Sequence, residues 1–328
     1  MSAIAAKPAD FGPHTLILDA EAEVERIVAV MRTQLRKDLK RRGLVLGVSG
    51  GIDSSLCAAL AARAVGPERV LCLLMPEADS DPESLALGRS LLAALGLEGI
   101  VEDIGETLAA MSCYRRRDEA IRTLVPEFGA GWGCKVVIAN ALESDSFAVS
   151  YLVVQSPEGE SRRLRMPAEI YQAVVAATNM KQRTRKQLEY YHADRLNHAV
   201  IGTPNRLEYD QGFFVKNGDG AADLKPIAHL YKSQVYQLAA HLGVPDAILR
   251  RPPTTDTWSL AQSQEEFYFS VPYAQMDLCM YGLDNDIPLA QVAAAAGLDA
   301  GQVERVWADI AGKRRATRYL HLPALRVE

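Results

Sequence analysis

A short string rich in glycine and hydroxyl groups offers the clearest chemistry in this sequence. It runs Gly47, Val48, Ser49, Gly50, Gly51, Ile52, Asp53, Ser54, Ser55. Glycines let backbone amides approach a ligand that side chains would keep away, and serine hydroxyls add donors for phosphate oxygens. The carboxylate of Asp53 fits such a site when it holds Mg²⁺, which neutralises both the acid and the phosphate. The string therefore predicts a binding site for ATP, used to activate a second substrate.

The neighbouring elements must place this string at the start of a helix. Residues 44–48 form an apolar run of strand length, and residues 54–64 are apolar enough for a buried helix. In a strand, turn and helix of this kind, the loop amides and the helix N-terminus together form a cradle for an anion. A serine-capped glycine turn without a ligand is the alternative, but the full string in this context favours phosphate. It matches neither GxxxxGK[ST] nor GxGxxG, which disfavours simple kinases and dehydrogenases.

The same alternation continues along the chain and indicates an α/β fold. Further strand-like runs lie at 70–75, 100–104 and 198–202, with a helix at 82–95 between the first two. This order predicts a Rossmann-like, doubly wound parallel sheet with helices on both faces. The C-terminal ends of its strands should line one ligand-binding edge.

Two regions depart from that alternation. Residues 151–155 and 162–166 flank a turn, which predicts an inserted β-hairpin within about 134–168. The chain after Ser233 is mostly helical, and its final helices are expected at about 289–296 and 300–311. We expect one domain over 1–328, with a core at about 20–260 and a helical C-terminal part at about 261–328.

Charge and composition restrict the partners. The 36 basic and 41 acidic residues give a net charge of −5, which disfavours nucleic acid as a partner. The five cysteines show no CxxC spacing and are expected as reduced thiols. No apolar run reaches the roughly 18 residues of a membrane span, and the first 18 residues lack the apolar stretch of a signal peptide. We therefore expect a cytoplasmic protein that has no membrane partner.

Two longer matches point to one enzyme family. The string SGGIDSS resembles the pyrophosphate-binding loop of the N-type ATP pyrophosphatases, a superfamily that includes GMP, asparagine and NAD synthetases. Residues 201–208 and 212–223, the latter reading GFFVKNGDGAAD, closely resemble NAD synthetase, and with residues 179–185 the likeness covers most of 44–260. The second match is far more specific than the glycine string.

The resemblance implies a role for each matching residue. Asp53 and Glu208 would hold Mg²⁺. ATP would contact Thr203, Lys232 and Thr254 in addition to Gly47, Ser49, Gly50, Gly51, Asp53 and Ser54 of the loop. The substrate deamido-NAD would contact Arg183, Lys216, Asp223 and Lys313. The charge of Lys232 and the oxygens of Glu208 also suit a metal-bound pyrophosphate on chemical grounds, although each residue alone is equally compatible with a surface position.

The chain also differs from the family pattern in two places. Residues 74–78 read LMPEA where the family often has arginine, leucine, proline, tyrosine and glycine, so the contacts to adenine stay open. Gly312 and Lys313 match only half of a histidine-lysine pair.

These assignments predict an ATP-dependent amidation. The nicotinate carboxylate of deamido-NAD would attack the α-phosphorus of ATP, and ammonia would then displace AMP to give NAD. Asp53, Lys216 and Lys232 would act by neutralising charge and positioning the reactants. About 40 residues precede the first strand, too few for an amidase domain, so we expect free ammonia or a separate glutaminase as the nitrogen source. The resemblance further implies a homodimer.

Two other functions remain open. Another N-type ATP pyrophosphatase could adenylate a different acid or a tRNA, although the reactive cysteine pairs of tRNA-thiolating members are absent. A non-catalytic sensor would bind the adenine nucleotide without releasing pyrophosphate, but the pairing of Asp53 with Glu208 favours turnover.

Overall fold

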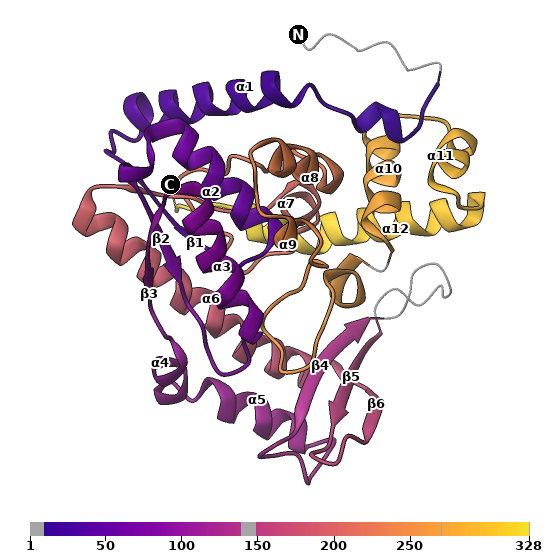
Figure 1. Ribbon diagram of the computed structural model, residues 1–328. Helices are drawn as coiled ribbons and strands as arrows, with labels where there is room; N and C mark the ends of the chain where they lie inside the picture. The colour runs from indigo at the N-terminus through magenta and orange to yellow at the C-terminus, as the bar shows by residue number, and fades with distance from the viewer. Residues whose placement is uncertain (1–9, 139–148, 270, 328) are drawn as a thin grey trace.

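A parallel sheet lies at the centre of the computed structural model, which describes residues 10–138, 149–269 and 271–327 (Figure 1). Its strands are β1 (Leu44–Gly47), β2 (Val70–Leu74), β3 (Glu98–Val101) and β7 (Ala199–Val200), in the order β3-β2-β1-β7. The chain moves outward from β1 through β2 to β3 and then returns to pair β7 with the other side of β1. The predicted Rossmann-like, doubly wound parallel sheet is therefore confirmed.

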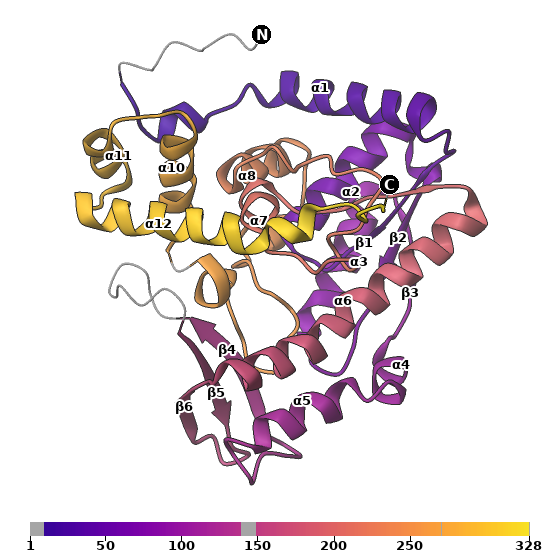
Figure 2. The same cartoon turned by 180° about the vertical axis from the view of Figure 1, so that it is seen from behind.

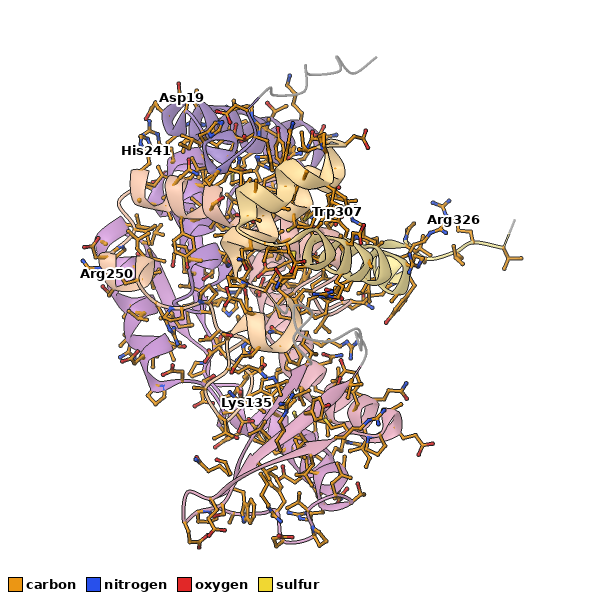
Figure 3. The ribbon with its side chains drawn as sticks, turned by 90° about the vertical axis from the view of Figure 1, so that its right-hand side faces the viewer. Asp19, Lys135, His241, Arg250, Trp307 and Arg326 are labelled. Atoms are coloured by element: carbon orange, nitrogen blue, oxygen red, sulfur yellow. The ribbon has the colours of Figure 1, made fainter. Side chains whose placement is uncertain are left out.

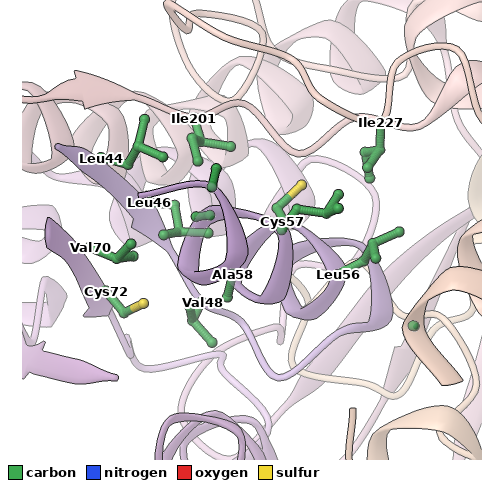
Figure 4. Close-up of a cluster of buried hydrophobic side chains, with 14 of the residues drawn as sticks. Leu44, Leu46, Val48, Leu56, Cys57, Ala58, Val70, Cys72, Ile201 and Ile227 are labelled. Atoms are coloured by element: carbon green, nitrogen blue, oxygen red, sulfur yellow. The ribbon is translucent and has the colours of Figure 1, made fainter. Parts of the chain in front are cut away.

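Side chains alternate between the two faces of the sheet, and each face is covered by helices. Leu44 and Leu46 point toward α1 (Ala20–Thr33), α2 (Ile52–Val65) and α3 (Pro82–Leu95), as Figure 4 shows for α2. Val45 lies on the opposite face, in a second core with α4 (Gly105–Ala110) and α6 (Ala168–Leu196). Burial on both faces explains why β1 and β2 are continuously apolar.

Local capping sets where several helices begin. Asp19 accepts a hydrogen bond from the amide of Ala22 at the start of α1, and Asp81 does the same for Glu83 at the start of α3. Pro82 occupies the first turn of α3, where a missing amide costs nothing. These ends agree closely with the sequence pattern.

Two predicted strands differ from the observed ones. The strand expected at 100–104 lies at Glu98–Val101, because Ile104 already stands at the N-terminus of α4. The strand expected at 198–202 keeps only two residues as β7, followed by an isolated bridge between Ile201 and Leu224. The apolar run continues past β7 because Ile201 and Gly202 stay buried, whereas β3 is followed by the polar residues Glu102 and Asp103.

A separate antiparallel sheet follows α5 (Cys113–Arg122). The predicted hairpin is present as β5 (Ser150–Gln155) and β6 (Ser161–Arg165), and a third strand, β4 (Gly133–Ile138), pairs with β5. Lys135 of β4 appears below the level of Asp19 in Figure 3. Cys134, Val136 and the other inward side chains form their own core with Trp258. β4 is not among the strands predicted from the sequence, and part of the expected insert, residues 139–148, lies outside the described residues.

The C-terminal part forms a third layer of helices (Figure 2). Its members are α10 (Tyr273–Asp284), α11 (Leu289–Ala296) and α12 (Ala300–Thr317), which share a core with Phe11 and Leu16. The remaining helices are η1 (Pro13–Leu16), η2 (Gln34–Asp38), η3 (Pro67–Arg69), α7 (Arg206–Gln211), α8 (Lys232–His241), α9 (Asp246–Leu249), η4 (Glu265–Phe269) and η5 (Arg318–His321).

All five cysteines are buried free thiols, as the sequence suggested. Among the described residues, none of the helices combines the length and the apolar character that a membrane crossing requires.

Candidate active site

A cavity of about 700 Å³ opens at the C-terminal ends of β1 and β2. Its wall includes the glycine loop, the residues after β2, one side of α6 and the segment 251–258. This is the edge at which open α/β sheets bind their ligands. Of the predicted site residues, those that line the cavity are Gly47, Ser49, Gly51, Asp53, Ser54, Thr203, Glu208 and Thr254.

The glycine loop has the backbone of an anion cradle. Gly50 adopts a left-handed conformation with φ of +72°, and a Cβ there would lie 2.7 Å from the carbonyl oxygen of Ser84. A side chain at this position is therefore excluded by both conformation and space. The hydroxyls of Ser54 and Ser55 donate to the carbonyl of Gly51 at 3.1 and 2.8 Å, which fixes the first turn of α2 behind the loop.

An ion pair lies beside this loop. Nζ of Lys232 lies 2.5 Å from Oδ2 of Asp53, and the lysine side chain is fully buried. Burial lowers the pKa of Lys232, but Asp53 and Glu208 together more than offset this effect, so the pKa is raised. Lys232 is thus a fixed positive charge behind the acidic centre rather than part of the cavity wall.

Asn205 joins the two acids. Its side-chain amide donates to Oδ1 of Asp53 at 2.9 Å, and its backbone amide donates to Oε2 of Glu208 at 3.1 Å. Because Asn205 also caps α7, the position of Glu208 is set by the helix start itself. Burial, followed by the charge of Asp53, raises the pKa of Glu208 to about 8.

These two carboxylates suit Mg²⁺. Magnesium is commonly bound through one or two carboxylates plus substrate phosphates. No cluster of three or more metal-ligating side chains occurs in the described parts of the chain, so phosphate oxygens would have to complete the coordination. The charge of Asp53 disfavours ionisation of Glu208, and a divalent cation bound by both carboxylates would relieve this repulsion.

Lys232 is in turn positioned from the C-terminal helices. The backbone amides of Lys232 and Ser233 donate to Asp277 of α10, at 3.1 and 2.7 Å. Nζ also lies 5.1 Å from the ring centroid of Tyr273. Asp277 and Asn205 were not anticipated, although the spacing from Asn205 to Glu208 is a recognisable capping signal.

Part of the cavity wall is aromatic. Phe213 stacks on Tyr268 with ring centroids 4.7 Å apart, and both line the cavity with Tyr171, Phe214, Trp258 and Phe267. Such walls favour planar rings. The cavity wall therefore combines polar groups that suit phosphate with aromatic rings that suit a planar ring.

The residues expected to contact the second substrate lie outside the cavity wall of this chain. Arg183 is exposed and donates to the carbonyl of Lys216 at 3.2 Å. Nζ of Lys216 donates to the carbonyl of Tyr319 at 2.7 Å, and Asp223 accepts from the amide of Val200 at 2.8 Å.

Lys313 likewise faces other partners. Its ammonium lies 2.6 Å from Asp309 and 2.5 Å from the carbonyl of Tyr268, and burial lowers the pKa of this lysine. Its nearest link to the cavity is therefore Tyr268, and its contact with the second substrate stays a prediction.

Comparison with known proteins places these features in one family. The family model for NAD synthase matches residues 23–127 and 157–316 and leaves out the part of the chain that contains β4 and β5. The NH3-dependent NAD+ synthetase of Rhizobium meliloti is 68% identical over 312 residues, which are 95% of this chain and 93% of that protein.

Two solved structures share the fold. An NMN synthetase from Francisella tularensis has a TM-score of 0.63 at 22% identity and covers 95% of this chain and 99% of its own. An NH3-dependent NAD synthetase from Campylobacter jejuni has a TM-score of 0.61 at 23% identity and covers 95% and 100%. Because the family model matches most of this chain and a relative is 68% identical to it, the chain belongs to the NAD synthase family.

Proposed function

We propose that the protein catalyses the ATP-dependent amidation of deamido-NAD to NAD, with ammonia as nitrogen donor and with AMP and pyrophosphate as products. The observation that carries this proposal is the joining of Asp53, Glu208 and Lys232 at the mouth of the glycine loop, in a chain so similar to an NH3-dependent NAD+ synthetase. ATP and an acid that bears a planar ring fit the polar and the aromatic parts of the cavity wall.

In the first step, the carboxylate of the substrate attacks the α-phosphorus of ATP and pyrophosphate leaves. Two anions meet, so the protein must mainly offset charge and hold the reactants in line. The amides of the loop from Ser49 to Ser54 hold the leaving pyrophosphate, and the charge of Lys232 offsets the acids beside it. Bound Mg²⁺, held by Asp53 and Glu208, would supply further charge neutralisation.

In the second step, ammonia attacks the carbonyl carbon of the acyl adenylate and AMP leaves with the bridging oxygen. No covalent bond to the protein is required. All five cysteines are buried, and desolvation raises the pKa of Cys57 and Cys72, which keeps these thiols in their unreactive form.

The finer parts of the proposal rest on the family resemblance. They are the use of Mg²⁺, the contacts of deamido-NAD with Arg183, Lys216, Asp223 and Lys313, a cytoplasmic homodimer as the working form, and the option of a separate glutaminase. The positions of Arg183 and Lys216 on the outside of one chain are compatible with a role at a contact between two chains.

The test is a reaction with ATP, Mg²⁺, ammonium and one of two acids, deamido-NAD or nicotinate mononucleotide. We expect NAD, AMP and pyrophosphate in equal amounts from deamido-NAD, and a much lower kcat/KM for the mononucleotide. Glutamine in place of ammonium should give no product. Preferred turnover of the mononucleotide, or release of ADP instead of AMP, would contradict the proposal.

A further inference from the structure

A buried ion pair on α6 faces the cavity and takes no part in the proposed reaction. Nζ of Lys186 lies 2.6 Å from Oε2 of Glu189, and the two residues are only 5% and 6% exposed. Both line the cavity. Burying a charge pair is costly, and replacing such pairs by apolar side chains is often neutral or stabilising. Stability alone therefore does not account for this pair.

The pair lies against the last residue of β1. A Cβ on Gly47 would stand 3.1 Å from Oε1 of Glu189, so the carboxylate lies close beside the residue at which the strand becomes the phosphate loop. In ATP, only the atoms O5′ and C5′ separate the α-phosphorus from the ribose ring. A triphosphate bound along Ser49–Ser54 with its α-phosphate nearest to β1 would bring the ribose close to Gly47, which lines the same cavity as Glu189.

The hydrogen-bonding capacity of Glu189 matches a sugar hydroxyl. Oε2 accepts from Lys186, and no described residue donates to Oε1. An ionised carboxylate only accepts hydrogen bonds, and the ribose hydroxyls are the nearest donors that ATP has to its phosphates. A lone carboxylate would repel the triphosphate, but Lys186 makes the pair neutral overall. The pair thus offers a strong acceptor without adding net negative charge.

We propose that the Lys186–Glu189 pair recognises the ribose of ATP, with Oε1 of Glu189 accepting a hydrogen bond from one sugar hydroxyl and Lys186 holding the carboxylate in place. Glu189 is a specificity-determining contact and Lys186 a positioning residue. The inference rests on the proposed function only in taking ATP as the nucleotide bound at the glycine loop.

The test measures nucleotide binding without deamido-NAD or ammonia. ATP, 2′-deoxyATP and 3′-deoxyATP are titrated with Mg²⁺ by calorimetry into the wild-type chain and into the double variant Lys186→Met with Glu189→Met. The double change removes the acceptor, keeps the site neutral and leaves side chains of similar length. A control variant, Lys135→Met with Glu266→Met, removes an ion pair whose members do not line the cavity.

We expect the wild-type and control proteins to bind one deoxynucleotide about tenfold more weakly than ATP, the loss typical of one charge-assisted hydrogen bond. The double variant should bind ATP about tenfold more weakly than the wild type does, and its affinities for ATP and for that deoxynucleotide should be equal. Equal binding of all three nucleotides by the wild type, or unchanged discrimination by the double variant, would overturn the inference.

The proposed function is judged separately. The choice of acid that is amidated does not depend on whether the site discriminates between ATP and its deoxy analogues. If the wild-type protein converts deamido-NAD but the double variant still discriminates between the nucleotides, only the ribose contact is contradicted. If the wild-type chain binds no ATP at all, both claims fail.

Discussion

Nζ of Lys232 and Oδ2 of Asp53 lie 2.5 Å apart, and this pair connects the phosphate loop to the C-terminal helices. Asp53 belongs to the first turn of α2, where the loop enters the helix, whereas Lys232 begins α8, whose first amides are held by Asp277 of α10. The charge beside the nucleotide site is thus placed by residues more than 170 positions apart in the sequence.

Removing either partner should slow turnover greatly, but the two changes should not have equal effects on stability. Lys232→Met leaves Asp53 and Glu208 without a cation, while Asp53→Asn leaves Lys232 with Glu208. We expect both variants to lose about 10²–10³ in kcat. Lys232→Met should lower the free energy of unfolding by about 3–5 kcal/mol, and Asp53→Asn by clearly less. Denaturant unfolding gives the comparison, and an equal or larger loss for Asp53→Asn would contradict this view of the charge centre.

Gly50 should tolerate no side chain. Gly50→Ala carries the cost of a left-handed residue, about 1–2 kcal/mol, and places a Cβ 2.7 Å from the carbonyl oxygen of Ser84. Gly297→Ala is the matched control, because Gly297 also has a positive φ but a Cβ there meets nothing within 4 Å. We expect Gly50→Ala to weaken ATP binding tenfold or more, by roughly 1.4 kcal/mol or above. The control should bind ATP as the wild type does, and similar affinities for both variants would show that the loop geometry is not required.

Asp277 should make stability depend on pH. Burial raises its pKa from 3.8 to about 6. The folded protein therefore binds this proton more tightly than the unfolded chain does, so the stabilising contribution is complete below about pH 4 and is lost as the pH rises to about 6. Asp277→Asn lacks this titration. We expect the unfolding free energy of the variant, relative to the wild type, to rise by about 3 kcal/mol between pH 4 and 7. If the unfolding free energies of the wild type and of the variant changed with pH in parallel, Asp277 would not be the cause of the pH dependence.

Lys216 tests the second-substrate assignments. Its ammonium now binds the carbonyls of Tyr319 and Leu322. If it also binds deamido-NAD, Lys216→Met should raise the KM for that substrate about tenfold, the effect of one lost charge-assisted contact, and should leave the affinity for ATP unchanged. Steady-state kinetics with each substrate varied in turn provide the measurement. A change confined to ATP would assign Lys216 to the nucleotide and contradict its assignment to deamido-NAD.

The sequence predicted the parts of the site that depend on local patterns. The glycine string followed an apolar strand and opened a helix, so its place at the edge of the sheet followed from topology rules. The helix at 82–95 also agreed with the structure, because Asp81, Pro82 and Gly96 mark its two ends. Local signals of this kind need no knowledge of tertiary contacts.

The contacts made over long distances in the chain could not be predicted in this way. Nothing near Asp277 indicates that it caps α8, and nothing near Lys186 indicates that its side chain is buried. The third strand β4 was missed because its partner β5 follows only after residues 139–148, beyond the reach of hairpin rules. The sequence resemblance named Arg183 and Lys216 but could not show that they lie outside the cavity of one chain.

The most direct test of the central claim follows the oxygen atoms of the substrate. Deamido-NAD labelled with ¹⁸O in its nicotinate carboxylate is converted with ATP and ammonium, and the products are analysed by mass spectrometry. If the carboxylate attacks the α-phosphorus of a nucleotide held by the glycine loop, one labelled oxygen will be found in AMP and the other in the amide of NAD. Label in pyrophosphate or in inorganic phosphate, or none in AMP, would contradict the account.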